Sequence, residues 1–288
     1  MNVQVSDAPI SARRSLPGFA TLATLTRRHP LVAFFALAYG ISWVMLLILY
    51  GLLRLPAALV ILLQTLGPTL AALMTVGALE GTAGRRGLIA RVRIWRVARR
   101  RYLFALVVIP VVCLLTALAL PGAFVGLGGQ SAVKLAIQFL AVVVVGFLSG
   151  PLFEEPGWRG FALPRLQARI GALRGTLLLG VLWAAWHLPQ YLVPEWANEN
   201  GGVTPILVVT FLLFVVAIAP IMTWLYNSTR GSLFHVMLAH SAINASLAVF
   251  VVSTSAVEVG LLGLGALSVV LIVTTRGRLG FVRSEDLG

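Results

Sequence analysis

Long apolar windows limit what this chain can fold into more than any other feature. An α-helix needs about 20 predominantly apolar residues to cross a bilayer. The 288-residue chain is 59% hydrophobic and 11% charged, whereas soluble domains carry about 25% charged residues. We therefore expect an all-α polytopic membrane protein with about eight transmembrane helices and no sizeable soluble domain. The expected spans are residues 31–53, 57–79, 102–120, 135–153, 176–194, 205–226, 231–252 and 256–275.

Basic residues fall almost entirely into alternate loops between these windows. If the N-terminus is cytoplasmic, all but two of the 22 Lys and Arg residues lie in cytoplasmic segments, the exceptions being Arg54 and Lys134. The positive-inside rule favours this orientation. We therefore expect both termini to be cytoplasmic in a multi-pass protein of the bacterial cytoplasmic membrane. The net charge of +13 then reflects topology, and no nucleic-acid partner is expected.

The pattern of spans and charges divides the chain into four segments. The basic loop alternates Arg with apolar residues, so we expect it to bind anionic headgroups of the lipid bilayer; an RNA or an acidic protein is the alternative partner. The single cysteine, Cys113, excludes an intramolecular disulfide, and no oligomeric state is assigned. The segments are a cytoplasmic tail (1–30), the first three spans with the basic cytoplasmic loop 80–101 (31–131), a polar-residue-bearing core (132–252), and the last span with a cytoplasmic tail (253–288).

Two adjacent carboxylates, Glu154 and Glu155, follow closely on an apolar run in a chain with nine acidic residues. An acidic residue at the centre of a membrane helix costs about 2.5–3.5 kcal/mol, so such residues are functional candidates. Arg159 lies four residues after Glu155, which allows an ion pair on one helix face and leaves Glu154 free to act. A solvated loop just after the span is the alternative interpretation.

Two histidines, His187 and His240, lie deep in predicted spans, and Asn244 shares a helix face with His240. His235 lies five residues before His240, so it points elsewhere and is expected to contact a helix end or headgroups. A carboxylate beside an imidazole can take a proton from water, and an imidazole or amide can stabilise an oxyanion. The alternative is that these residues only hydrogen-bond helices together.

A metal site is a further possibility for the same residues. Glu154, His187 and His240 suit Zn²⁺, with a fourth position left for water. The H-E-x-x-H pattern of a metal-binding helix is absent, and the three residues come from three predicted helices. A Zn²⁺ mechanism and a metal-free glutamate mechanism therefore both stay open. A shared site requires span 135–153 to continue through Arg159, or a cavity open to the cytoplasm.

The order and spacing of these residues resemble the CAAX protease and bacteriocin-processing (CPBP) family of intramembrane endopeptidases, which includes the type II CAAX prenyl endopeptidases and abortive-infection proteins. The resemblance covers roughly residues 135–252. It implies that Glu155 and Arg159 hold the first motif in shape. Trp183 departs from the usual Phe of the second motif, and we expect this change to alter packing and not chemistry. The motifs are Glu154-Glu155-x-x-x-Arg159, an aromatic residue four positions before His187, and His240-x-x-x-Asn244.

The resemblance implies an enzyme that hydrolyses a peptide bond near the cytoplasmic face. Glu154 would activate the water with His187 as its partner, whereas His240 and Asn244 would bind the substrate carbonyl. The expected substrate is a membrane-associated peptide or lipidated protein, with a prenylated CAAX-type chain as one form. A non-proteolytic bacteriocin-immunity or scaffold protein is the alternative. A proton-coupled transporter is less favoured, because the sequence shows no internal repeat.

Overall fold

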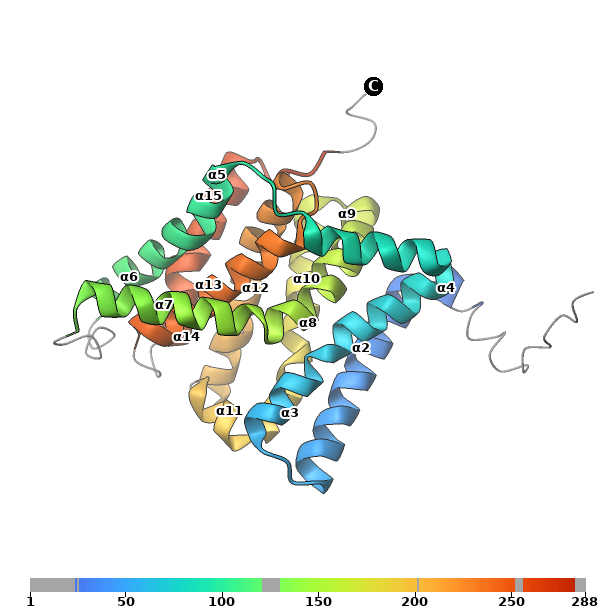
Figure 1. The fold of residues 1–288 in the computed structure, drawn as a ribbon, viewed down its shortest axis with the longest axis horizontal. Helices are drawn as coiled ribbons and strands as arrows, with labels where there is room; N and C mark the ends of the chain where they lie inside the picture. The colour runs from blue at the N-terminus through green and yellow to red at the C-terminus, as the bar shows by residue number, and fades with distance from the viewer. Residues whose placement is uncertain (1–23, 25, 121–129, 201, 252–255, 283–288) are drawn as a thin grey trace, which may run out of the picture.

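A computed structural model describes residues 24, 26–120, 130–200, 202–251 and 256–282. These residues form helices joined by short connections and no strand, which confirms the predicted all-α fold (Figure 1). The α-helices are α2 (Pro30–Leu46), α3 (Ala57–Gln64), α4 (Leu66–Ala90), α5 (Arg99–Leu103), α6 (Ile109–Ala119), α7 (Ala132–Phe147), α8 (Gly150–Gly157), α9 (Leu163–Ile170), α10 (Ala172–Trp186), α11 (Pro194–Glu199), α12 (Pro205–Ser228), α13 (Leu233–Phe250), α14 (Ala256–Val259) and α15 (Gly265–Thr274).

The described residues contain six helical segments that are long and apolar enough to cross a membrane, or seven if one bent pair counts as a span. The chain is therefore an integral multi-pass membrane protein, and the predicted count of eight spans stays a prediction. The predicted span 176–194 is not one continuous α-helix. There α10 ends at Trp186 after 15 residues, and a 3₁₀ stretch follows at Leu188–Leu192. Pro189 accounts for this end, because a proline disfavours the α conformation in the residue before it.

The predicted span 135–153 contains parts of two helices, α7 and α8. The first, α7, ends at Phe147, and α8 begins at Gly150 after a bend of 49°. Pro151 occupies the first turn of α8, where its missing N–H removes no intrahelical hydrogen bond. The second helix then runs through a π-helical stretch at Trp158–Ala162 to the end of α9. The adjacent glutamates therefore lie within a helix that starts inside the protein.

The basic loop predicted at 80–101 is largely structured. A bend at Gly81, whose φ of 65° suits glycine, redirects the last turns of α4. Arg91 Nη1 then donates hydrogen bonds to Tyr226 Oη at 2.6 Å and to the Gly160 carbonyl at 3.2 Å. Arg91 therefore ties this segment to the helices beneath it. Headgroup binding stays a prediction for the exposed arginines of the segment.

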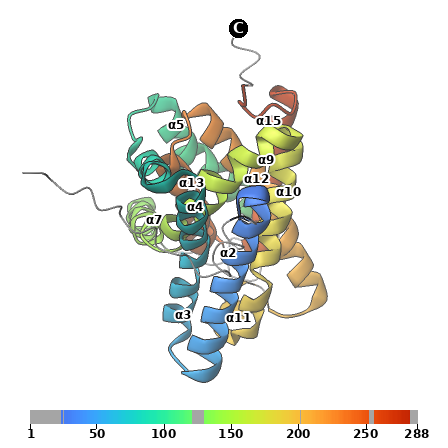
Figure 2. The same ribbon diagram turned by 90° about the vertical axis from the view of Figure 1, so that its right-hand side faces the viewer.

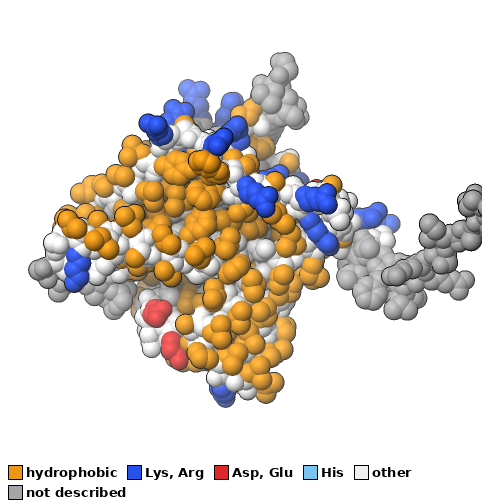
Figure 3. Space-filling model, viewed as in Figure 1, with side chains coloured by type: hydrophobic (Ala, Val, Ile, Leu, Met, Phe, Trp, Pro, Cys, Tyr) orange, Lys and Arg blue, Asp and Glu red, His pale blue; other side chains and the backbone are white. Residues whose placement is uncertain are grey.

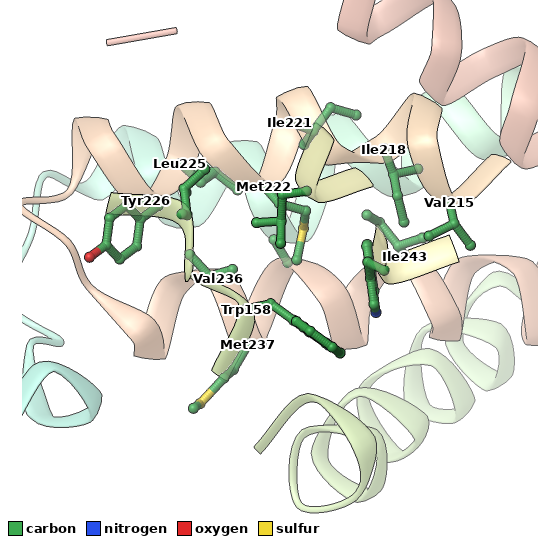
Figure 4. Packing of buried hydrophobic residues seen from close by; sticks show 14 of the residues in the cluster. Trp158, Val215, Ile218, Ile221, Met222, Leu225, Tyr226, Val236, Met237 and Ile243 are labelled. Carbon is green, nitrogen blue, oxygen red and sulfur yellow. The ribbon is translucent and has the colours of Figure 1, made fainter. Parts of the chain in front are cut away.

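The central helix of the bundle is α13. It packs against α6, α7, α8 and α12, and two thirds of its span is buried. Figure 4 shows side chains of α12 and α13 facing one another, with Trp158 close beside them. The Trp158 side chain is fully buried and also contacts Phe34 of α2 and Trp186 of α10. This packing fixes α8, α10 and α13 relative to one another, and these helices carry the polar residues singled out in the sequence.

Candidate functional site

The adjacent glutamates are both buried in α8. Glu154 is 6% exposed and Glu155 is 0% exposed. Since the helix continues unbroken through Arg159, that residue lies one turn from Glu155, as the sequence spacing predicts. The interpretation of this segment as a solvated loop is wrong.

Glu155 is the centre of a buried polar network. Its Oε1 accepts hydrogen bonds from Arg159 Nη1 at 3.1 Å and from His240 Nδ1 at 2.8 Å. The side chains of Glu155 and Arg159 are both 0% exposed. Because an ionised carboxylate only accepts hydrogen bonds, His240 Nδ1 carries the hydrogen. The ion pair thus orients the His240 ring and leaves its Nε2 for other partners.

Glu154 is held by a different group. Trp183 Nε1 donates a hydrogen bond to Glu154 Oε2 at 3.0 Å. The absence of a side chain at Gly150 leaves room for the other oxygen, because a Cβ there would lie 3.0 Å from Oε1. The expected direct partner, His187, makes its hydrogen bond elsewhere. The shared role of Glu154 and His187 in activating water stays a prediction, and the hydrogen bond that holds Glu154 comes from Trp183.

Four of the predicted site residues line one cavity of about 860 Å³: Glu154, His187, His240 and Asn244. Trp183 lines it as well. Glu155 and Arg159 do not line it, and instead support His240 and the Trp183 ring, over which the Arg159 guanidinium lies at 4.2 Å from the ring centroid. The tertiary structure thus brings together three segments that are far apart in the sequence.

His187 caps the end of α10. Its Nδ1 lies 2.8 Å from the carbonyl oxygen of Trp183, which can only accept, so Nδ1 donates and Nε2 of the neutral ring keeps its lone pair. The half-buried ring stacks on Trp196 at 6.3 Å and meets the edge of Phe211 at 5.3 Å. These aromatic contacts orient the imidazole at the cavity wall.

The two remaining polar residues of α13 behave differently from each other. Asn244 lies one turn after His240 and is exposed where it lines the cavity. His235 points away from this site, as its spacing predicts, but it is fully buried. It pairs with Ser232, the N-cap of α13, and packs against the Tyr102 ring. The helix-end contact expected of His235 is therefore confirmed, and its burial excludes the alternative headgroup contact.

The segment that carries these residues is similar in sequence to known proteins. Residues 136–246 match the family of type II CAAX prenyl endopeptidases described as Rce1-like. This part of the chain is similar to that family. A curated relative, CAAX prenyl protease 2 of Methanococcus maripaludis, is 30% identical over 122 residues, which make up 41% of this chain and 45% of the relative. The chain thus matches somewhat under half the length of this relative, and the predicted family resemblance is confirmed.

A catalytic Zn²⁺ site needs three protein ligands close together. Among the residues that the structure describes, no three His, Cys, Asp or Glu side chains gather closely enough to hold a metal ion. The Zn²⁺ hypothesis for Glu154, His187 and His240 therefore supplies no step in the mechanism below.

Trp183 is the site residue whose role the sequence analysis missed. Its replacement of the family's usual Phe was expected to affect packing alone, yet its indole N–H is the hydrogen-bond donor to Glu154. The available signal was chemical, since Trp carries an N–H donor and Phe carries none. The position four residues before His187 places this donor one helical turn from the imidazole.

Proposed function

We propose that the chain is an intramembrane endopeptidase that hydrolyses a peptide bond of a membrane-associated substrate. The observation that carries the proposal is the Glu154 carboxylate, which is 94% buried yet lines a cavity shared with His187, His240 and Asn244. The match to the CAAX endopeptidase family supports the reaction class. Buried carboxylates are costly in a membrane protein and are retained where they act.

In the proposed mechanism Glu154 is the general base. Its carboxylate takes a proton from water as the water oxygen bonds to the carbonyl carbon of the scissile peptide. The Trp183 N–H holds one carboxylate oxygen, which leaves the other to accept the proton. His187 Nε2 is a second acceptor at the cavity wall and helps to orient the water. Glu154 then delivers the proton to the departing amine as the C–N bond breaks, which balances the reaction.

The negative charge that develops on the carbonyl oxygen needs donors. The Asn244 side-chain amide supplies one, and His240 supplies a second from Nε2 when that nitrogen is protonated. The Glu155 carboxylate accepts the hydrogen bond from Nδ1 and so fixes the orientation of the His240 ring. Glu155 and Arg159 are therefore positioning residues in this proposal, and they act through His240.

Hydrolysis of a peptide library by the detergent-purified full chain tests the proposal. The library contains matched peptides with and without a C-terminal prenyl group, because the curated relative is named a CAAX prenyl protease. We expect cleavage by the wild-type protein, none by the Glu154→Gln variant, and no effect of a chelator. Loss of cleavage with chelator and recovery with Zn²⁺ would contradict the metal-free mechanism. Absence of cleavage throughout would favour the immunity or scaffold hypothesis.

Replacing Trp183 by Phe is expected to lower kcat/KM by about 10- to 100-fold, since a hydrogen bond to a charged group contributes about 1.5–3 kcal/mol. The ring and its packing are largely kept, so the folded protein should survive. Trp186→Phe is the matched control, because its indole Nε1 has no hydrogen-bond partner among the described residues. Steady-state kinetics compare kcat/KM of the two variants with that of the wild type. Equal activities would show that the Trp183 N–H has no part in catalysis.

A further inference from the structure

The cavity and the arginines lie at opposite ends of the same helices. The first half of α12 lines the cavity, for example with Phe211, and its far end leads to Arg230. The helix α13 runs in the opposite direction. It begins just after Arg230, and its second half lines the cavity from His240 onward. Likewise α10 carries Arg174 near its start and ends at Trp186, directly before the cavity residue His187. The three helices therefore define one arginine end and one cavity end.

Glu154 also lies far from the arginine end of its helix. It lies 16 residues before the end of α9 at Ile170, and at 1.5 Å per residue about 24 Å of helix separates the two. The basic residues Arg165 and Arg169 sit toward the far end of this helix. Since a bilayer core is about 30 Å thick, the carboxylate is far from the arginine-bearing face.

The remaining walls of the cavity come from the ends of segments on its own side. They include Ala57 at the start of α3, Glu195 and Glu199 of α11, and Val257 of α14. The helices α3 and α11 contact each other at the lower end of the molecule, away from α5, α9 and α15 (Figures 1 and 2). These segments adjoin three of the loops that the sequence analysis places outside the cell. No Lys or Arg is among the described residues that line the cavity.

The distribution of basic residues shows which end of the bundle faces the cytoplasm. Figure 3 shows blue Lys and Arg side chains gathered along the upper side of the molecule, where α5, α9 and α15 lie. Of the described basic residues, Arg54 and Lys134 alone lie outside the segments that the sequence analysis assigns to the cytoplasm or to the membrane interior. Membrane proteins keep their Arg-rich loops in the cytoplasm. A cavity at the other end then faces away from the cytoplasm, which reverses the cytoplasmic cleavage expected from the family resemblance.

We propose that the cavity opens on the extracytoplasmic side, and that the substrate is a polypeptide segment presented from that side of the membrane. The inference deepens the proposed endopeptidase function and rests on it. An exported or membrane-inserted polypeptide meets this condition. A lipidated C-terminus that stays in the cytoplasm does not, because the cavity and the cytoplasm lie at opposite ends of the bundle.

Two single-cysteine additions test the orientation. The native Cys113 is fully buried and serves as the unlabelled background. Asn198→Cys lies exposed on α11, and Gly87→Cys lies exposed on α4, where an added Cβ meets nothing within 4 Å. With a membrane-impermeant maleimide on spheroplasts, we expect labelling of Asn198→Cys at once, and of Gly87→Cys only after permeabilisation. The reverse pattern overturns the proposal.

A second experiment tests access to the cavity. A peptide that the detergent-purified chain cleaves is coupled to a sulfonated, membrane-impermeant fluorophore and added to oriented membrane vesicles. We expect right-side-out vesicles to cleave it directly, and inside-out vesicles to cleave it only after detergent, with Glu154→Gln vesicles as the blank. Cleavage by intact inside-out vesicles alone overturns the extracytoplasmic opening but leaves the endopeptidase function standing. Absence of any Glu154-dependent cleavage in detergent overturns the function, whatever the labelling shows.

Discussion

Replacing Glu154 by Gln is expected to lower kcat by about 10²- to 10⁴-fold, the usual contribution of a general base. Glutamine keeps the size of the side chain and an oxygen that can accept the Trp183 N–H bond of 3.0 Å. It cannot take a proton from water. The loss should therefore appear in kcat, with little change in KM or in the folded state. Steady-state kinetics on a cleaved library peptide, together with circular dichroism, measure both effects.

A matched control separates this effect from a general loss of charge. Glu80 pairs with Arg165 at 2.7 Å in a partly exposed contact that does not line the cavity. Glu80→Gln is therefore expected to retain activity close to that of the wild type. If Glu154→Gln kept wild-type kcat, Glu154 would not be the base, and the other cavity groups would have to be reconsidered.

Replacing Arg159 by Met is expected to lower the free energy of unfolding by about 3–5 kcal/mol, because it leaves the Glu155 charge buried without its ion-pair partner. Both side chains are 0% exposed, so water cannot replace the lost bond. The contact of the guanidinium with the Trp183 ring is lost as well. Detergent-micelle unfolding followed by circular dichroism measures the change. Activity should fall too, since His240 loses its fixed carboxylate.

Two further variants test the reason for that loss. Arg165→Met breaks an ion pair whose side chains are 26% and 50% exposed, and such exposed pairs contribute about 0–1 kcal/mol. The double variant Glu155→Gln with Arg159→Met removes both charges, so it should be more stable than Arg159→Met alone. A double variant as unstable as the single one would assign the effect to packing and not to the unpaired charge.

Local patterns predicted a large part of this protein. Apolar windows of sufficient length predicted a multi-pass helical membrane protein, because hydrocarbon admits helices that satisfy their own backbone groups. The four-residue spacing predicted the contact of Glu155 with Arg159, since such residues are one helical turn apart. The same rule placed Asn244 with His240 and separated both from His235. Each of these inferences concerns residues within one helix.

Features that depend on several helices at once needed the tertiary structure. The chain bends between Phe147 and Gly150, and α10 stops at Trp186, so helices break inside two of the apolar windows. Hydropathy measures apolar length but does not show where a helix breaks inside a buried segment. A break that is buried in protein or lines a cavity is allowed in the membrane interior.

Only the packing of α8, α10 and α13 decided which side chains meet. The Trp183 N–H reaches Glu154 and the His240 ring reaches Glu155 across distances of 29 and 85 residues in the chain. Rotating one helix about its axis would change both pairings without altering its apolar content. The end of the bundle at which the cavity opens depends in the same way on where several helices end together. Amino-acid order by itself thus determined the chemistry available to the site, and the tertiary structure determined its partners and its direction, because contacts between helices follow from their rotation and crossing.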